Sequence, residues 1–343
     1  MKASGRVLVR LSPLAWFAAF LLLLAAVATA SAEKVTFSLD WVPYGKHAGF
    51  YVALDQGFYR KAGLDVTIER GYGSPDTAKK VAAKSADFGF TDPSSVLLAR
   101  SQKLGVRQIA MIHGKGMLVV FALKGSGIHH MKDLEGRRIG ETIGGAGYAT
   151  FQAVANANGI KKWEWVGMRP AAKNPSLLSK KVDAIITYIA VQPALRMGAR
   201  KQGEEIVTLL YSDYGVNIPA DGLATHDETI RNRPDVVRRF VEATLEGMAW
   251  GIPRGRHEAA MEVFLKHLPE TSRDLGLAQW KIGVEHMVTE DALKNGLGHI
   301  SPEQMDYTYK VLSQAYKLDP SVSMAEVYTN GYLPTPPIRV RKP

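Results

Sequence analysis

Residues 34–68, KVTFSLDWVPYGKHAGFYVALDQGFYRKAGLDVTI, place a strand, a helix and a second strand in succession. Apolar and polar residues alternate from Val35 to Leu39, as in a half-buried strand. Apolar residues at helical spacing run from His47 to Lys61, and Gly63 closes that helix. Leu64 to Ile68 has the composition of the next strand. A strand, a connecting helix and a second strand are the unit of parallel α/β sheets, so this stretch predicts the α/β class.

The same alternation continues along the chain and restarts near Gly125. Two β/α sections followed by helices predict two lobes, each a mostly parallel sheet flanked by helices. We expect a first lobe of residues 33–121 plus 223–343 and an inserted second lobe of residues 122–222. The two chain crossings between these lobes would form a hinge, and hinged closure around a ligand is a standard transition of such proteins.

The N-terminal segment has the three-part pattern of a secretory signal. Lys2, Arg6 and Arg10 form a positive head, Leu14–Ala28 is apolar, and Ala30-Ser31-Ala32 provides small residues for cleavage. The alternative is a retained membrane anchor, but the apolar run is short of the ~20 residues that a spanning helix needs. We therefore expect residues 1–32 to be a signal peptide and the mature protein to be periplasmic.

Composition excludes several classes of function. The formal net charge is +10, but the basic residues occur as scattered pairs rather than as the concentrated patch of a nucleic-acid-binding protein. The absence of cysteine excludes disulfides, thiol nucleophiles, iron–sulfur clusters and zinc–thiolate sites. The common hydrolase, metalloprotease and P-loop motifs are absent as well. We expect a monomeric binding protein with no catalytic residue, metal or cofactor.

Candidate ligand-binding residues lie in the loops that follow predicted strands, where α/β sheets collect their ligands. The aromatic members offer flat faces for stacking, and the others offer directional hydrogen bonds. This mixture suits a planar heterocycle better than a sulfonate or nitrate, which needs concentrated Arg or Lys donors. Asp221 lies at the presumed hinge. The candidates are Trp41, His47, Tyr51, Thr91, Asp92, Ser95, Glu141, Gly144, Gly147, Tyr148, Tyr188 and Gln192.

Several of these candidates have an alternative role. Trp41 and Tyr51 are equally suited to packing in a hydrophobic core, where large aromatic residues are common. His47 could have a purely structural role. The loop Gly144–Gly147 could present helix N–H groups to an acceptor on the ligand, or it could simply form a tight strand–helix turn.

Five segments resemble the thiamine pyrimidine synthase-like family of binding proteins: SLDWVP (38–43), HAGFYVA (47–53), KGSGI (124–128), DLEGRRIG (133–140) and NGYLP (330–334). The third and fourth segments are also similar to those of sulfonate, taurine and nitrate binding proteins. The resemblance implies a type II-like periplasmic binding protein with its ligand between the lobes. It further implies the soluble component of an ABC importer, with an inner-membrane permease as partner and a thiamine pyrimidine precursor or similar small heteroaromatic compound as ligand.

The resemblance also raises an enzymatic alternative. Eukaryotic members of the family make the thiamine pyrimidine from pyridoxal phosphate and a histidine, using iron and a Cys-rich motif. This chain has no cysteine, and the segment where the enzymes place their reactive lysine reads Thr91-Asp92-Pro93-Ser94-Ser95. We therefore expect no pocket lysine and no synthase chemistry. A second alternative is a binding protein for an alkyl sulfonate or a taurine-like anion. The resemblance implies that Trp41, His47, Ser95 and the Gly144–Gly147 loop face the ligand.

Overall fold

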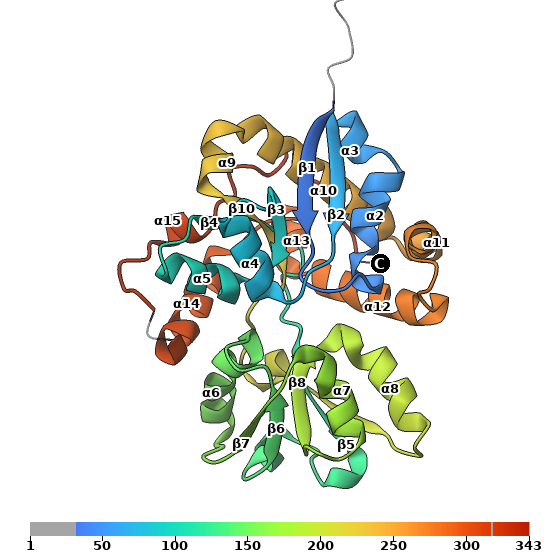
Figure 1. Cartoon of the computed structure of the whole chain (residues 1–343), viewed down its shortest axis with the longest axis vertical. Helices are drawn as coiled ribbons and strands as arrows, with labels where there is room; N and C mark the ends of the chain where they lie inside the picture. The colour runs from blue at the N-terminus through green and yellow to red at the C-terminus, as the bar shows by residue number, and fades with distance from the viewer. Residues whose placement is uncertain (1–31, 317, 343) are drawn as a thin grey trace, which may run out of the picture.

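The computed structural model describes residues 32–316 and 318–342. The expected signal peptide, residues 1–32, lies outside the described residues except for its last position. The described chain forms two lobes, stacked vertically in Figure 1, with the N-terminal strands and most of the C-terminal helices in the first lobe. No helix of this part of the chain is both long and apolar enough to cross a membrane.

The first lobe is built around a five-stranded sheet of order β2-β1-β3-β10-β4. β1 is parallel to β2 and β3, whereas β10 is antiparallel to its neighbours β3 and β4. The sheet is therefore mixed, with a single strand running against the others. The strands are β1 (Glu33–Ser38), β2 (Leu64–Glu69), β3 (Phe88–Thr91), β4 (Val106–Met111) and β10 (Gly222–His226).

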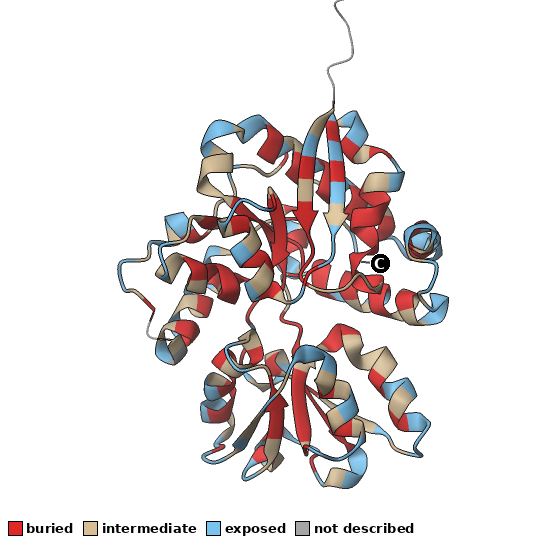
Figure 2. Cartoon of the chain, viewed as in Figure 1, coloured by how far each residue is buried: buried red, intermediate tan, exposed pale blue. Residues whose placement is uncertain are grey.

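The second lobe repeats this plan with a sheet of order β7-β6-β8-β5-β9. β6 is parallel to β7 and β8, and β5 is antiparallel to β8 and β9. The predicted architecture of two α/β lobes is confirmed. In both lobes the central strands are buried between helices (Figure 2). The strands are β5 (Leu118–Leu123), β6 (Arg138–Glu141), β7 (Glu164–Gly167), β8 (Ala184–Tyr188) and β9 (Ile206–Leu210).

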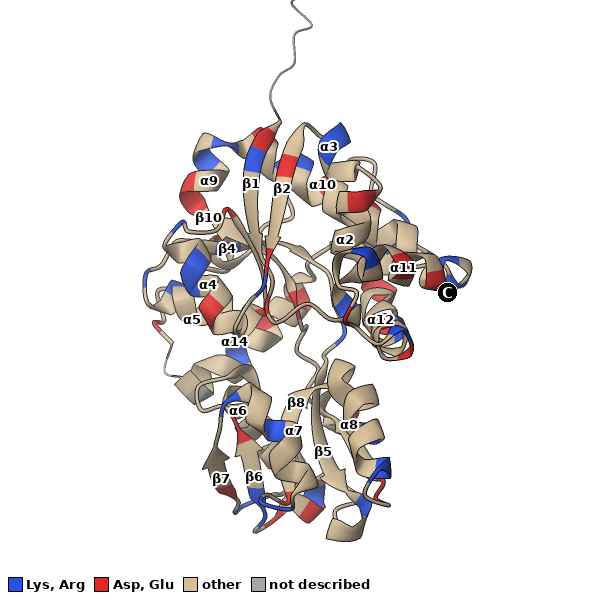
Figure 3. Ribbon diagram, turned by 45° about the vertical axis from the view of Figure 1, so that its right-hand side comes forward, with Lys and Arg blue, Asp and Glu red and all other residues tan. Residues whose placement is uncertain are grey.

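Helices cover both sheets, and basic and acidic residues are interspersed along the chain (Figure 3). The α-helices are α2 (Ala48–Asp55), α3 (Phe58–Lys61), α4 (Ser74–Ala82), α5 (Pro93–Ser101), α6 (Ala146–Asn158), α7 (Pro170–Leu178), α8 (Gln192–Arg200), α9 (Asp227–Asn232), α10 (Pro234–Gly251), α11 (His257–His267), α12 (Arg273–Met287), α13 (Glu290–Asn295), α14 (Pro302–Tyr316) and α15 (Met324–Val327). The 3-10 helices are η1 (Gly45–His47), η2 (Lys124–Ser126), η3 (Met131–Leu134), η4 (Ile189–Val191), η5 (Tyr211–Tyr214) and η6 (Arg254–Arg256).

The single helix expected over 47–61 is divided in the structure. It is formed by the end of η1 followed by α2 and α3, which are separated at Gly57. Gly57 has φ +74°, a left-handed conformation that interrupts a right-handed helix and that glycine adopts without a steric penalty. The periodicity of the apolar residues continues across this break, so the pattern alone could not locate it.

The two chain crossings lie side by side. β5 pairs with β8 and β9 in the second sheet, so the first crossing occupies residues 112–117, before the boundary expected at residue 122. The second crossing ends at Asp221, immediately before β10. Its backbone pairs with the first crossing, because Asp221 O accepts from the N–H groups of Ile112 and His113 at 3.1 and 2.9 Å, and Ala220 N donates to His113 O at 2.9 Å.

Helix α14 contacts both lobes, although the C-terminal helices were expected to belong to the first lobe alone. Val311 packs into the hydrophobic core of the second lobe. Met305 and Leu312 pack with residues of α5 and β4 in the first lobe. The C-terminal region therefore provides a further connection between the lobes besides the two crossings.

The core of the first lobe is centred on Phe240 of α10, which is completely buried. Its ring stacks on Phe88 with centroids 3.9 Å apart and on Tyr59 at 5.6 Å. Phe37 meets it edge-on at 5.3 Å. This stack ties α10 and α3 to the central strands β1 and β3.

Phe240→Ala should lower the free energy of unfolding by about 3–5 kcal/mol, because the smaller side chain leaves a cavity that the surrounding rings cannot fill. Tyr72→Ala is the control. Its side chain is 61% exposed, and the change should stay within about 0.5 kcal/mol. Urea denaturation followed by circular dichroism measures both variants. Equal losses would contradict the central place of Phe240 in this core.

Candidate ligand-binding site between the lobes

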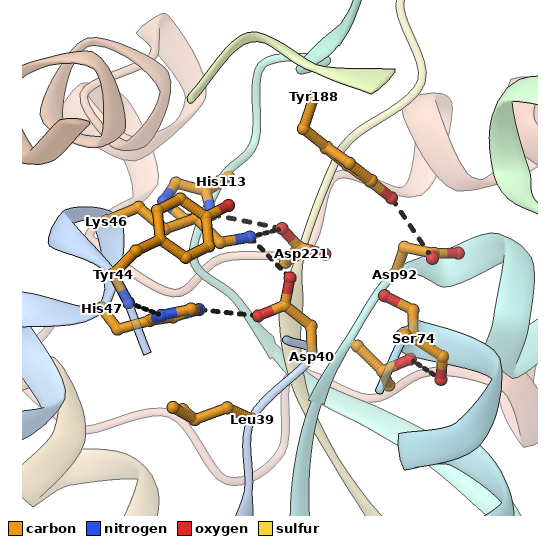
Figure 4. Close-up of polar contacts among 12 residues, drawn as sticks. Leu39, Asp40, Tyr44, Lys46, His47, Ser74, Asp92, His113, Tyr188 and Asp221 are labelled. Carbon is orange, nitrogen blue, oxygen red and sulfur yellow. Dashed lines mark hydrogen bonds and ion pairs between the residues drawn. The ribbon is translucent and has the colours of Figure 1, made fainter. Parts of the chain in front are cut away.

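A buried ion-pair network lies at the edge of the first lobe that faces the second (Figure 4). Lys46 Nζ donates to Asp40 Oδ2 and to Asp221 Oδ2, both at 2.7 Å. The side chains of Lys46 and Asp221 are 0% exposed, and that of Asp40 is 7% exposed. Asp40 follows β1, Lys46 belongs to η1, and Asp221 ends the second crossing. We call these three residues, with His47 and His113, the Lys46 cluster.

Charge attraction keeps Lys46 and Asp40 ionised despite their burial. Burial acts to lower the pKa of Lys46, but attraction by Asp221 and Asp40 outweighs it and raises that pKa well above its ordinary value. Burial acts to raise the pKa of Asp40, but attraction by Lys46 and His47 outweighs it and holds that pKa below its ordinary value. The lysine is therefore an ammonium held between two carboxylates.

His47 is neutral and fixed in orientation. Burial lowers its pKa, although Asp40 partly opposes this shift. Its Nδ1 accepts from the Tyr44 backbone N–H at 3.2 Å, which leaves Nε2 as the protonated nitrogen that donates to Asp40 Oδ1 at 2.7 Å. His47 thus binds the carboxylate oxygen of Asp40 that Lys46 does not bind.

Aromatic rings from both lobes surround the Lys46 ammonium. Its Nζ lies 5.5 Å from the ring centre of Tyr44, 5.1 Å from that of Phe90 and 5.4 Å from that of Tyr188. Tyr188 is the last residue of β8 in the second lobe, so the cation interacts with π faces across the boundary between the lobes.

Asp92 makes a direct side-chain contact with the second lobe. The Tyr188 hydroxyl donates to Asp92 Oδ2 at 3.4 Å (Figure 4). Asp92 also caps α5, because its Oδ1 accepts from the Ser95 N–H at 2.8 Å, and Pro93 suits the first helical position. Burial raises the pKa of Asp92 to about 6, and the charge of Asp221 adds to this rise.

Some polar atoms of this region have no hydrogen-bond partner among the described residues. They are Asp221 Oδ1 and both ring nitrogens of His113, and both residues are 0% exposed. His113 lies beside the ion pairs, with Nδ1 3.8 Å from Asp221 Oδ2. Buried polar groups without partners are rare in proteins, and one explanation is a missing ligand or water.

The second lobe presents its own buried ion pair at the ends of β6 and β8. Glu141 Oε1 accepts from Lys173 Nζ at 2.8 Å, and Ile186 O accepts from the same nitrogen at 2.8 Å. Burial raises the pKa of Glu141 and lowers that of Lys173, although the two attract each other. Glu141 Oε2 has no partner among the described residues.

The loop before α6 and the first turn of that helix contact this pair. Gly147 is required there, because a Cβ would lie 2.5 Å from Ile186 Cγ2 and 3.1 Å from Glu141 Oε2. Gly144 has φ +81°. The Tyr316 hydroxyl of α14 donates to Gly144 O at 3.0 Å, so the loop is held against the C-terminal helix.

The structure brings together some of the predicted site residues. His47, Asp92, Ser95 and Tyr188 lie in or beside the Lys46 cluster. Glu141, Gly144 and Gly147 form the facing edge of the second lobe. Trp41 is half-buried in the loop after β1, where its carbonyl accepts from Gly71 N at 3.0 Å.

Other predicted residues make contacts within their own lobe. Tyr51 is 7% exposed and packs against Phe264 and His267, so it occupies the core position that was its alternative. Thr91 donates to Ser74 O at 2.9 Å. Gln192 donates to Thr208 Oγ1 at 2.8 Å, and Tyr148 packs on Trp165 with centroids 5.1 Å apart.

The expectation of no lysine at the site is wrong. Lys46 lies at the centre of the site, in the 3-10 helix η1. The sequence pattern predicted a loop at this position, next to a helix. The expectation considered only the segment from Thr91 to Ser95, which does lack lysine. Asp40 and His113 were also missed as site residues. Their signal was their position within a few residues of a predicted strand end.

No group of three or more His, Asp or Glu side chains is arranged to hold a metal ion within the described ranges. The arrangement offers aromatic faces, carboxylate oxygens and a hydroxyl from two lobes, with both buried lysines already paired.

Two α/β lobes joined by paired crossings, with polar groups where the strand ends meet, have the architecture of a periplasmic binding protein. A solved structure of this kind is the periplasmic aliphatic sulphonate binding protein SsuA from Escherichia coli. It has a TM-score of 0.66 and 13% identity and covers 88% of this chain and 99% of its own. At this identity the likeness shows the fold alone.

The chain belongs to the NMT1/THI5-like family, which matches residues 45–254, more than half of its length. It is 26% identical over 314 residues to the riboflavin-binding protein RibY of Chloroflexus aurantiacus, covering 88% of this chain and 86% of RibY. It is 26% identical to the formylaminopyrimidine-binding protein of Halalkalibacterium halodurans, covering 70% of this chain and 72% of the relative. The thiamine pyrimidine synthase-like resemblance is therefore confirmed.

The family also contains enzymes. The chain is 23% identical over 261 residues to the 4-amino-5-hydroxymethyl-2-methylpyrimidine phosphate synthase THI11 of Saccharomyces cerevisiae, covering 73% of this chain and 76% of the synthase. Family membership alone does not separate binding from catalysis.

Lys46→Met should lower the free energy of unfolding by about 3–5 kcal/mol, because it leaves two buried carboxylates without their counter-ion. Lys124→Met is the matched control. Lys124 pairs with Glu205 on the surface, where the side chains are 64% and 68% exposed, so its loss should cost less than about 1 kcal/mol. Guanidinium denaturation of both variants measures the difference. Similar small losses would contradict the central role of the Lys46 ion pairs.

Asp92→Asn should stabilise the protein above pH 6 and have little effect near pH 4. The folded-state pKa of Asp92 is raised to about 6 from 3.8, so its contribution to stability is present at low pH and lost as the pH rises through 6. Asparagine keeps the helix cap, and removing the buried charge should gain up to about 3 kcal/mol. Thermal unfolding from pH 4 to 8 measures this; a gain that does not depend on pH would contradict it.

Proposed function

We propose that this protein is an exported solute-binding protein of an ABC importer. Its ligand would be a thiamine pyrimidine precursor or a similar small heteroaromatic compound. The observation that carries this proposal is the meeting of Tyr188 from one lobe with Asp92 and Lys46 from the other. Aromatic faces and hydrogen-bonding groups from both strand edges thereby converge on one region. The names of the relatives, which bind riboflavin and formylaminopyrimidine, support a heteroaromatic ligand.

The proposed location is the periplasm, and the proposed partner is an inner-membrane permease. The secretory pattern of residues 1–32 supports export. The fold is shared with the ligand-binding component of an ABC-type import system from Staphylococcus aureus, with a TM-score of 0.65. We propose that the protein acts as a monomer that presents the closed lobes to the permease.

A synthase function is the less favoured alternative. A pyridoxal Schiff base requires a neutral lysine amine, but Lys46 is an ammonium held by two carboxylates with a raised pKa. The chain also lacks cysteine for the Cys-rich motif of the enzymes. Borohydride treatment after incubation with pyridoxal phosphate distinguishes the two functions. Covalent attachment at Lys46 would favour the synthase.

A sulfonate or another anion is also less favoured. Its recognition requires unpaired basic donors. The buried lysines of the described chain are Lys46 and Lys173, and each is already bonded to carboxylates. An anion at this site would instead approach the carboxylates of Asp92 and Asp221.

A thermal-shift screen tests the proposal. Pyrimidine precursors of thiamine, riboflavin and nucleobases are compared with taurine and alkyl sulfonates. A ligand at a hundredfold excess over its Kd should stabilise the protein by about 2.7 kcal/mol, because it binds only the folded state. We expect heteroaromatic compounds to raise the melting temperature. A shift with sulfonates alone would discard the heteroaromatic ligand, and no shift with any compound would discard the binding function.

Tyr188→Ala should weaken the binding of the ligand found in this screen by about 1–3 kcal/mol, taking base–aromatic stacking as the guide. Tyr332→Ala is the matched control, because Tyr332 packs beside Arg238 in the first lobe and is not part of the cluster. Isothermal titration calorimetry measures both affinities. An unchanged affinity for Tyr188→Ala would remove this residue from the site.

A further inference from the structure

Within the described part of the chain the buried charges are unbalanced, and all of them lie at the interlobe edges. Among the described residues, the buried carboxylates are Asp40, Asp92, Glu141 and Asp221, and the buried cations are Lys46 and Lys173. His47 and His113 do not restore the balance, because burial lowers the pKa of both and keeps them neutral. Two buried carboxylates therefore have no counter-ion of their own.

The pairing identifies which carboxylate groups are in excess. Asp40 and Asp221 share the single ammonium of Lys46, and Glu141 has Lys173. Asp92 has no cationic partner. It accepts from the Ser95 N–H and hydroxyl and from the Tyr188 hydroxyl, which are all neutral donors. The uncompensated charge is thus located on Asp92 and on the Asp40–Asp221 pair.

Asp92 and Asp221 lie near each other in the structure. Figure 4 shows the Asp221 carboxylate between Lys46 and Asp92, and the charge of Asp221 raises the pKa of Asp92. One oxygen of Asp221 binds Lys46, and the other, Oδ1, has no partner among the described residues although Asp221 is 0% exposed. His113, beside Asp221, also has no hydrogen-bond partner for its ring nitrogens.

Burying a carboxylate is costly when it lacks both a counter-ion and a full set of hydrogen-bond donors. A bound cation with N–H groups would supply the missing positive charge and the missing donors. We propose that the interlobe site binds its ligand as a cation, through N–H groups that lie between Asp92 and Asp221. The ligand class is then a protonated amino-substituted heteroaromatic ring or an aryl amidinium. This inference rests on the proposed function and specifies the charge of the ligand.

The surrounding rings suit the same class. Tyr188 and Tyr44 face the buried ammonium of Lys46, and aromatic faces attract a flat cation by the same interaction. Lys46 itself does not repel such a ligand strongly, because two carboxylates neutralise it from adjacent sides.

Three probes of nearly equal shape test the charge directly: benzamidine, a cation; benzamide, which is neutral; and benzoate, an anion. Calorimetry or thermal shift on the purified protein at pH 7.5 gives their relative affinities. We expect benzamidine to bind at least about tenfold more tightly than benzamide, since hydrogen bonds between charged groups exceed those to neutral groups by this margin, and benzoate to bind least. Equal or reversed ranking, or no binding of benzamidine, would overturn the inference.

Two variants locate the effect. Asp92→Asn keeps the α5 cap and should reduce benzamidine affinity about tenfold, with a smaller effect on benzamide. Asp65→Asn, an exposed change of the same kind on β2, is the control and should alter neither. Circular dichroism confirms folding of each variant. If Asp92→Asn retains full benzamidine affinity, the cation does not bind there and the inference fails.

The outcomes remain separable from those of the proposed function. A protein that binds neutral heteroaromatic compounds in the thermal-shift screen but shows no preference for benzamidine is a solute-binding protein without a cation site. A protein that binds none of the compounds in either experiment lacks the proposed function itself.

Discussion

The bond of Lys46 to Asp40 and Asp221 is the constraint on which the rest of the site depends. It joins the loop after β1 and the turn η1, which are close in the sequence, to the end of the second crossing, which lies 175 residues after Lys46. Each ion would be costly to bury alone, so the three segments hold one another in place. The positions of His47, Tyr44 and Tyr188 around this ammonium follow from that arrangement.

The two lobes could be predicted from the sequence because their strands are short apolar runs followed by turn residues, and this pattern is local. The exact limits of the lobes could not. The sequence of β5 predicts a strand but does not show to which lobe that strand belongs. Only its pairing with β8 and β9 assigns it to the second sheet. Likewise, β7 and α7 were not predicted, since the strand has only four residues and Pro175 lies within the helix.

The site was predictable only in part, for a related reason. Strand ends mark the edge where ligands bind, and this located Asp92, Glu141 and Tyr188. Pairing across the fold is not visible in the sequence, so Lys46 and His113 were missed and Tyr51 was included. Tyr51 and His47 lie four residues apart on consecutive helical turns, and tertiary packing alone sends one ring to the core and the other to Asp40.

The backbone pairing of the two crossings has a mechanical consequence. Two adjacent segments joined by hydrogen bonds behave as a flat strip, which flexes easily across its thin dimension and resists torsion and in-plane shear. The ion pair with Lys46 fixes this strip at Asp221. Bending should therefore occur between Asp221 and the second sheet. An opening and closing of the lobes about this strip would return the same rings and carboxylates to register each time.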